Sequence, residues 1–397
     1  MNNEPSKAYL RKGKEESLKR FHPWVFSGAI HHFDTEPEEG DCVEVYSSDN
    51  RYIATGHYQI GSIMVRVLTF DGEQIDSDFY YRRLAAALDV RQHIGLTASA
   101  DTNAFRLVHG EGDNLPGLVI DIYGETAVMQ AHSVGMHKDR RLIADALLKL
   151  MEGRLRHIYY KSETTLPFKA NLLEESGFLA GGKDVDNIAI ENGLRFHVDW
   201  LKGQKTGFFV DQRENRKLLE HYARGMKVLN MFCYTGGFSF YAMRGGASLV
   251  HSVDSSQKAI DLTNANVNLN FPGDSRHQAF AEDAFKFLDN MKEEYNLIIL
   301  DPPAFAKHKN ALSNALKGYS RLNQKALEKI AHGGVLFTFS CSQVVTKDNF
   351  RNAVFTAAAY ARRKVRILHQ LHQPADHPIN IYHPEGEYLK GLVLYVE

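Results

Sequence analysis

The C-terminal half of the chain alternates short apolar runs with helical stretches. Five runs are short enough for buried strands, at 228–232, 248–253, 277–281, 297–300 and 335–339. Stretches with helical spacing lie between them, for example at 256–270, 284–291 and 316–331. Strands that alternate with helices are typical of right-handed βαβ crossovers. The pattern therefore predicts an α/β fold with a doubly wound, Rossmann-like sheet, and two last runs at 365–371 and 391–396 are further strand candidates.

The N-terminal half has a different texture. Residues 8–70 contain short alternating runs at 43–46, 52–57 and 64–68, separated by Gly, Asp and Ser turns, which predict a small β-rich domain. Helical patterns at 78–94 and 136–151 enclose strands within 108–130, and a hairpin at 188–198 folds over Glu191-Asn192-Gly193. We therefore predict three domains: a β-rich domain at 1–72, a small α+β domain at 73–185 and the Rossmann-like domain at 186–397.

Charge changes this picture only locally. The 397 residues carry a net charge of −1, so the whole-molecule balance does not indicate a nucleic-acid partner. Basic residues nevertheless gather in two places: Lys7, Arg11, Lys12, Lys14, Lys19 and Arg20 near the start, and Lys307, Lys309, Lys317, Arg321 and Lys325 in the C-terminal half. Such clusters are usually solvated faces. The second one follows a candidate catalytic segment, where a phosphate backbone would lie.

Cysteine usage and hydropathy indicate the compartment. Cys42, Cys233 and Cys341 are too few and too widely spaced for a disulfide framework or a zinc cluster. The first residues lack an apolar signal core, and no apolar run approaches the length of a membrane span. We therefore expect a cytoplasmic protein with reduced thiols, no metal and no membrane partner.

A loop with two glycines follows the first strand of the predicted Rossmann-like sheet. Its residues, Phe232 to Phe238, include Thr235, Gly236 and Gly237 and lead into a helix. At this turn, glycines let the backbone pass close to a bound ligand. A Gly-Gly turn after a strand is also common for structural reasons alone, so this loop needs support from other residues.

That support comes from acids at the ends of the next strands. Asp254 ends the second strand, where a carboxylate can accept both hydroxyls of a ribose, and Asp283 follows the third, where a side chain can reach an adenine amino group. Either residue could instead be the N-cap of the helix that follows it. The loop lacks the glycine pattern for a pyrophosphate and the lysine of a P-loop. The predicted ligand is therefore an adenosine without phosphates, and S-adenosylmethionine (SAM) fits.

Candidate chemistry lies at the ends of the fourth and fifth strands. Asp301-Pro302-Pro303-Ala304-Phe305 follows the run at 297–300, and Cys341 follows the run at 335–339. A parallel sheet delivers both segments to the same carboxyl edge. A lone cysteine is most often a buried structural thiol, but an acid on a rigid Pro-Pro segment beside it suggests covalent chemistry on a nucleobase.

The ordered set of motifs resembles the bacterial 23S ribosomal RNA cytosine-C5 methyltransferases with an N-terminal PUA domain. The resemblance covers nearly the whole chain and rests on the segments at 106–118, 205–213, 232–238, 301–305, 339–342 and 384–391. It implies a PUA domain that binds RNA, a central α+β domain and a class I SAM-dependent methyltransferase domain. Gln212 resembles an upstream motif that touches the cofactor, so the predicted cofactor-binding residues are Gln212, Phe232, Thr235, Gly236, Gly237, Asp254, Asp283 and Asp301.

The expected catalytic residues are Cys341 and Asp301. C5 of cytosine is a poor nucleophile, so a thiolate must first add to C6 before C5 can take a methyl group. Cys341 would supply that thiolate, Asp301 would hold the cytosine edge at the exocyclic amine or at N3, and Phe305 would stack on the base or merely pack. A base must then remove the C5 proton. The candidates are Asp301, His377, Glu385, Lys390 and water, because the Asp-Pro-Pro segment lacks the second cysteine of a related group.

Two other readings stay open. A base-nitrogen methyltransferase, for example at guanine N7, needs no thiol, because a ring nitrogen already carries a lone pair. A non-catalytic RNA-binding protein would leave Cys341 and Asp301 unexplained. The segment 12–26 mixes basic and aromatic residues as an RNA-contacting module does, although we interpret Trp24 as a core residue of its domain. The oligomeric state, including a homodimer, also stays open.

Overall fold

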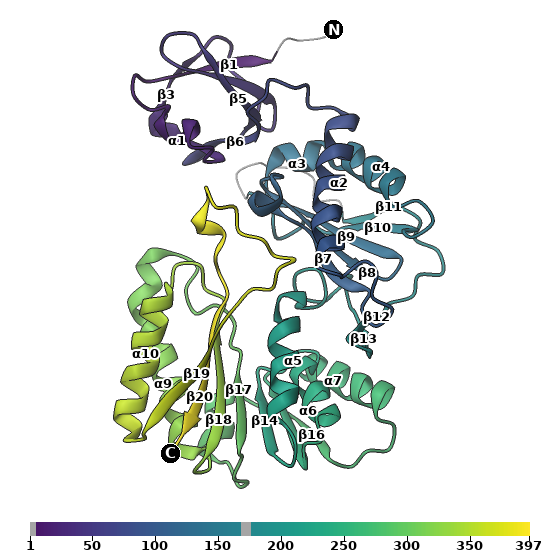
Figure 1. The fold of residues 1–397 in the computed structure, drawn as a ribbon, viewed down its shortest axis with the longest axis vertical. Helices are drawn as coiled ribbons and strands as arrows, with labels where there is room; N and C mark the ends of the chain where they lie inside the picture. Colours follow the sequence, from purple (N-terminus) through teal and green to yellow (C-terminus); the bar gives the residue numbers. More distant parts are fainter. Residues whose placement is uncertain (1–4, 168–175) are drawn as a thin grey trace. The chain divides into compact units, whose positions relative to one another are not determined.

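The computed structural model describes residues 5–167 and 176–397, which divide into two compact units (Figure 1). The first unit comprises Met1–Gly193, Val198–Val210 and Ala375–Gly386, and the second comprises Leu194–His197, Asp211–Pro374 and Glu387–Glu397. Within the described residues, no helix is long and apolar enough to cross a membrane.

The first unit begins with a six-stranded sheet in the order β2-β6-β5-β4-β1-β3. Its core contains Leu10, Val43, Val45, Val65 and Val67, which follow the alternation that predicted these strands. The predicted runs at 43–46, 52–57 and 64–68 are confirmed. The elements are β1 (Ser6–Leu10), α1 (Glu16–Lys19), β2 (Trp24–Phe26), β3 (Ile30–Phe33), β4 (Cys42–Tyr46), β5 (Tyr52–Tyr58) and β6 (Ile63–Thr69).

A second sheet in this unit has five strands, in the order β11-β10-β9-β8-β7, and helices α2 and α4 contribute to its core. The helix expected at 136–151 is two helices, because Ser133 caps a first segment that ends at Asp139. The elements are α2 (Ser77–His93), β7 (Ala104–His109), β8 (Leu118–Tyr123), β9 (Thr126–Ala131), α3 (Val134–Lys138), α4 (Arg140–Leu150), β10 (His157–Tyr160) and β11 (Gly177–Ala180). The predicted hairpin is present as β12 (Ile188–Glu191) and β13 (Leu194–His197).

Trp24 corrects one expectation about this unit. The side chain is half-buried and lies outside the core of the first sheet. Its Nε1 donates to Glu111 Oε1 at 2.8 Å, and its ring lies 4.3 Å from that of His383. An indole that is apolar on its faces and polar at one edge suits such a boundary. Trp24 therefore joins the first sheet to segments far along the chain instead of filling the core of that sheet.

The second unit contains the predicted doubly wound sheet. Seven strands lie in the order β16-β15-β14-β17-β18-β20-β19, with β14 to β18 parallel and β20 antiparallel to both β18 and β19. All residues of β17 and β18 are buried, as expected for central strands covered on both faces. The strands are β14 (Lys227–Met231), β15 (Leu249–Asp254), β16 (His277–Ala281), β17 (Leu297–Leu300), β18 (Gly334–Ser340), β19 (Val365–His372) and β20 (Lys390–Val396).

Helices α6 to α9 connect the successive parallel strands, α5 precedes β14, and α10 leads from β18 to β19. Their bounds are α5 (Arg213–Tyr222), α6 (Gly237–Arg244), α7 (Gln257–Asn270), α8 (Ala284–Asp289), α9 (Leu312–Lys329) and α10 (Lys347–Ala361). Helices α9 and α10 run side by side and bury Leu322, Ala326 and Phe350 with the sheet core (Figure 1). The order β16-β15-β14-β17-β18 places a topological switch point between β14 and β17, and ligands of such sheets bind at the carboxyl end of that point.

Candidate active site

The carboxyl edge of the seven-stranded sheet gathers most of the predicted site residues. Phe232, Asp254 and Asp301 directly follow or end β14, β15 and β17. The register pairs Met231 with both Val253 and Leu300, so these positions lie level across neighbouring strands. Cys341 follows β18 in the same way, and Asp283 lies just after β16. The sheet therefore brings together residues that are far apart in the sequence.

The loop after β14 has an unusual backbone. Phe232, Tyr234 and Gly236 have positive φ angles of 58°, 47° and 83°. A Cβ on Gly236 would lie 2.8 Å from side-chain atoms of Phe240 and Thr263, so only glycine fits there. Thr235 is buried. Packing alone therefore requires a glycine at this position. The tight fit of Gly236 also fixes the conformation of the loop at the switch point.

Asp254 supports this loop directly. Its Oδ2 accepts a hydrogen bond from Tyr234 N at 3.0 Å, and its Oδ1 accepts from Ser256 N at 2.9 Å. The N-cap of α7 is Ser256, whose hydroxyl accepts from Ala259 N. The alternative interpretation of Asp254 as the helix cap is thus wrong. Its carboxylate is partly exposed at the strand end, where a ribose would meet it.

Asp283 differs from Asp254 in this respect. Its Oδ1 accepts from Lys286 N at 3.0 Å, which makes it the N-cap of α8. The alternative role of Asp283, as the N-cap of the helix that follows it, is therefore confirmed. Asp283 is exposed, and its second carboxylate oxygen can still accept from a ligand. Acidic acceptors after β16 and β15, and after β17 on the other side of β14, suit the hydroxyl and amino groups of adenosine and would repel a phosphate. This set of acceptors fits SAM.

Asp301 lies in a small polar network. Gln212 Nε2 donates to Asp301 Oδ2 at 3.1 Å, and Gln212 Oε1 accepts from Asn215 Nδ2 at 2.6 Å. Burial, and then the charge of Asp211, raise the pKa of Asp301 to about 7, against the effects of Gln212 and Arg216. At neutral pH both its protonated and ionised forms are therefore populated.

The motifs alone did not identify Asp211 as a site residue. Tyr388 donates its hydroxyl hydrogen to Asp211 Oδ2 at 2.6 Å. Asp211 Oδ1 is buried and lacks a hydrogen-bond partner within residues 5–167 and 176–397. Asp211 and Tyr388 belong to the 205–213 and 384–391 motifs, but neither motif predicts that the two segments meet. A buried acceptor of this kind suits a donor on a bound molecule.

Cys341 lies against the Asp-Pro-Pro segment. Its Sγ is 4.0 Å from Pro302 O, and the neighbouring Ser342 Oγ donates to Ala306 O at 2.5 Å. Cys341 and Cys42 are partly exposed, whereas Cys233 is buried. Burial raises the pKa values of Cys233 and Cys42 to about 12, so neither thiol forms an appreciable thiolate at neutral pH.

Phe305 has a packing role. Its ring centroid lies 4.6 Å from that of Tyr319, and a Cβ on Gly318 would lie 3.0 Å from the Phe305 ring. The side chain is half-buried and packs against the core of the second unit. Of the two roles expected for Phe305, the structure favours packing.

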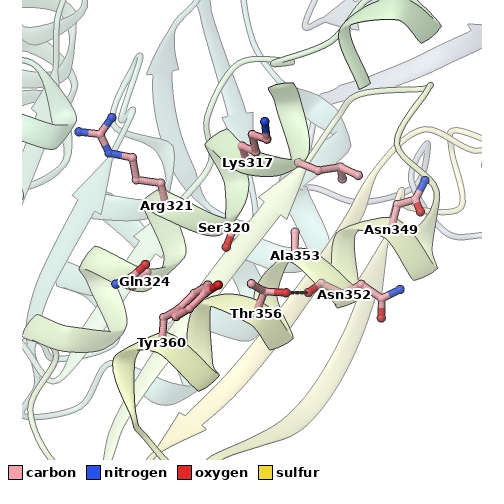
Figure 2. A pocket seen from close by; sticks show the side chains of 10 residues that line it. Lys317, Ser320, Arg321, Gln324, Asn349, Asn352, Ala353, Thr356 and Tyr360 are labelled. Atoms are coloured by element: carbon pink, nitrogen blue, oxygen red, sulfur yellow. Dashed lines mark hydrogen bonds between the residues drawn. The ribbon is translucent and has the colours of Figure 1, made fainter. Parts of the chain in front are cut away.

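The basic residues after Asp301 do not act as one cluster. Lys325 forms an ion pair with Asp289 of α8, whereas Lys317 and Arg321 line a hollow of about 530 Å³ between α9 and α10. Figure 2 shows the two cations on α9, with Asn349, Asn352 and Tyr360 on α10. The Arg321 guanidinium lies over the Phe285 ring of α8, 5.1 Å from its centroid, so Lys317 is the cation that shares the hollow with these amides.

The candidates for the general base lie in different units. Asp301 and Lys390 share the second unit with Cys341. His377 is buried beside Asp376 and the ring of His109, and Glu385 lies near His22 and His383, all within the first unit. The first two candidates therefore have a defined relation to the thiol.

Comparisons with known proteins identify the family. An S-adenosylmethionine-dependent methyltransferase model matches residues 175–381, and a PUA-like domain model matches residues 8–70. The chain is 42% identical to ribosomal RNA large subunit methyltransferase I of Aeromonas hydrophila, over 97% of this chain and 98% of the relative. It is 41% identical to the protein of that name from Alteromonas mediterranea, over 98% of each chain.

A solved structure from Streptococcus mutans, described as a SAM-dependent methyltransferase, shares the fold. It superposes with a TM-score of 0.83 at 24% identity, over 98% of this chain and 100% of the other. A methyltransferase in complex with SAH gives a TM-score of 0.84 at 24% identity, with the same coverage. The chain therefore belongs to the ribosomal RNA large subunit methyltransferase I family, with an N-terminal PUA-like domain and a C-terminal domain that is a SAM-dependent methyltransferase.

Proposed function

We propose that this protein methylates C5 of a cytosine in 23S ribosomal RNA through a covalent adduct with Cys341. The names of its relatives support the large-subunit RNA as the substrate, and that substrate implies a cytoplasmic enzyme. The choice of cytosine C5 depends on one observation: a partly exposed thiol lies 4.0 Å from Pro302 O, next to Asp301 at the sheet edge that fits SAM. Methyl transfer to a ring nitrogen requires no nucleophilic thiol, so it would not account for this one.

In the proposed reaction, the Cys341 thiolate adds to C6 of cytosine, and the electron pair of the C5–C6 double bond moves to C5. SAM supplies the methyl group to C5 and leaves as S-adenosylhomocysteine. A base then takes the C5 proton, the double bond forms again, and the C6–S bond breaks to release the thiolate. The ring keeps its other atoms, and the net exchange at C5 is one methyl group for one proton.

Asp301 would bind the Watson–Crick edge of the base. Gln212 occupies one oxygen of its carboxylate, which leaves the other oxygen for the exocyclic amine of cytosine. Pro302 and Pro303 restrict the backbone that carries this acid, so its position changes little when the base arrives. Gln212, Phe232, Thr235, Gly236, Gly237, Asp254 and Asp283 remain the proposed cofactor-binding set, together with Asp301.

The test uses labelled SAM and large-subunit RNA from cells that lack this methylation. Nucleosides from the digested RNA are separated and identified by mass spectrometry. We expect label in 5-methylcytidine and a loss of about a thousandfold or more in rate for Cys341→Ala, because the pKa values of Cys42 and Cys233 are raised to about 12. Cys42→Ala, far along the sequence in β4, is the matched control and should keep its activity.

A trap for the adduct separates this mechanism from its rivals. RNA that contains 5-fluorocytidine has no proton to lose at C5, so the wild-type protein should form a stable covalent complex after methyl transfer. The Cys341→Ala variant should form none. Label in a purine that survives Cys341→Ala would instead support a base-nitrogen methyltransferase, and absence of turnover in the wild type would support a non-catalytic RNA-binding protein.

A further inference from the structure

Lys390 is the first residue of β20 and is almost fully buried. In the sheet it lies opposite Ser340 of β18 on one side and His372 of β19 on the other. Only 5% of the residue is exposed, which is rare for lysine. A buried ammonium beside the strand that ends at the proposed nucleophile requires an explanation.

The ammonium is bonded to the turn that carries Cys341. Lys390 Nζ donates to Ser342 O and to Val345 O, each at 2.6 Å. Ser342 directly follows Cys341, and Val345 directly precedes Thr346, the N-cap of α10, so both carbonyls belong to the short connection after β18. Ser342 Oγ holds the same turn to Ala306 O at 2.5 Å. Lys390 and the segment after Asp-Pro-Pro thus hold the Cys341 turn from two sides.

The charge of Lys390 is poorly compensated by its direct partners. Both acceptors are neutral carbonyls, and a buried cation costs free energy unless an anion lies nearby. Burial lowers the pKa of Lys390 to about 8, while the negative charges of Cys341 and Glu387 raise it and Lys347 lowers it. Glu387 also forms an ion pair with Lys347. The attraction between two opposite charges stabilises both of them. A Cys341 thiolate therefore stabilises the Lys390 ammonium, and the ammonium stabilises the thiolate to the same extent.

We propose that Lys390 is a positioning residue: its ammonium holds the turn that carries Cys341 and stabilises the Cys341 thiolate. The inference deepens the proposed function, because it takes Cys341 as the nucleophile. It assigns Lys390 a role that a general base does not have, since the protonated form is the one that acts. The reactivity of the thiol should then depend on Lys390 even when no RNA is present.

The test measures alkylation of Cys341 by iodoacetamide across pH in the full-length protein, with the modified peptide followed by mass spectrometry. In Lys390→Met the midpoint of the pH profile should move up by about one unit, which is about tenfold less thiolate at a pH below the midpoint. Lys390→Gln, which keeps a hydrogen-bond donor without the charge, should shift in the same direction. Lys390→Arg keeps a cation and should stay nearer the wild type.

Lys364→Met is the matched control. Lys364 is an exposed lysine of the same unit and is not among the charges that shift the pKa of Lys390, so its replacement should leave the alkylation profile nearly in place. An unshifted profile in a folded Lys390→Met or Lys390→Gln variant would refute the inference. If Lys390→Met does not fold, Lys390→Gln decides.

The alkylation profile is independent of turnover. Methylation of C5 that persists in Cys341→Ala would refute the proposed function, whatever alkylation shows. If Cys341→Ala loses C5 methylation as expected but the Lys390 variants leave the alkylation profile unshifted, only the role of Lys390 would be refuted. A role in folding alone would lower the thermal stability of the Lys390 variants without moving the pH midpoint.

Discussion

The three cysteines of this chain differ in what surrounds them, and that difference decides which one can react. Burial raises the pKa values of Cys42 and Cys233 to about 12, and for Cys42 the charges of Asp139 and Asp41 add to it. Cys341 is partly exposed and follows a central strand. The buried ammonium of Lys390 donates a hydrogen bond to Ser342 O, in the turn that carries Cys341. A thiolate is stabilised by positive charge and solvent access, so Cys341 is the residue whose surroundings suit a nucleophile.

Asp301 leads to a prediction about pH. With a pKa of about 7, about one tenth of its carboxyl groups are ionised at pH 6 and about nine tenths at pH 8. If the carboxylate accepts the exocyclic amine of cytosine, kcat/KM should rise up to about tenfold between these values. The measurement is kcat/KM for RNA against pH in the wild type and in Asp301→Asn.

The Asn variant separates this ionisation from that of the thiol. Asp301→Asn should have a low kcat/KM, and its pH profile should lack the rise near pH 7. Any pH dependence of kcat/KM that is due to Cys341 should persist in this variant. A fall in wild-type kcat/KM above pH 7 that Asp301→Asn abolishes would instead mean that the protonated acid donates to N3 of the ring.

The loop between β14 and α6 shows how an element prepares a site. Its left-handed residues turn the backbone sharply from the strand into the helix, and Asp254 holds Tyr234 N from the next strand. Gly236 lies at the N-cap of α6 and packs where a side chain would meet Phe240 and Thr263. The shape of the loop therefore depends on the absence of one Cβ.

We expect Gly236→Ala to lower the free energy of unfolding by about 2–4 kcal/mol, because it adds both a positive-φ penalty and a steric clash. Affinity for SAM should fall with it. Gly273→Ala is the control, since Gly273 has a similar φ of +76° but open space around its Cβ position. Urea unfolding and SAM titration measure both effects. Equal losses in the two variants would show that the contact with Phe240 and Thr263 carries no cost.

For the whole molecule, local charge matters more than net charge. The net charge of −1 gives little long-range attraction to RNA, so binding must rely on positive surfaces. Lys317 and Arg321 form one such surface on α9, the helix that follows the Asp-Pro-Pro segment, and both line the hollow between α9 and α10 (Figure 2). Nearby amides of Asn349 and Asn352 can donate hydrogen bonds to phosphate oxygens as well.

Replacement of Lys317 and Arg321 by Gln should weaken RNA binding, with SAM affinity unchanged. The slope of log K against log salt concentration should become shallower by about 0.7 for each phosphate of single-stranded RNA that is no longer neutralised. The control is a double Gln variant of Lys292 and Lys329, two cations of the same unit that lie outside the hollow. An unchanged slope in the first variant would place the RNA backbone elsewhere.

The kind of fold and most of the candidate chemistry follow from the order of residues alone. The apolar runs at 228–232 and 297–300 and the helical spacing between strands are local patterns, and a parallel sheet places every strand end at one edge. Asp301 and Cys341 could therefore be predicted as neighbours from their positions after two apolar runs. The adenosine acids, Asp254 above all, follow from the same rule.

The side chains that support these residues became evident only from packing in three dimensions. Tyr388 reaches Asp211 across 177 residues of sequence, and Lys390 reaches the Cys341 turn across 48. Such contacts arise from strand order and side-chain packing, which leave no periodic trace in the chain. The same holds for Trp24, a residue type that is usually core in a small β domain but whose indole here lies at a boundary, and for the pKa of Asp301, which depends on burial. Local pattern thus sets where the reactive groups lie, and packing sets their protonation and their partners.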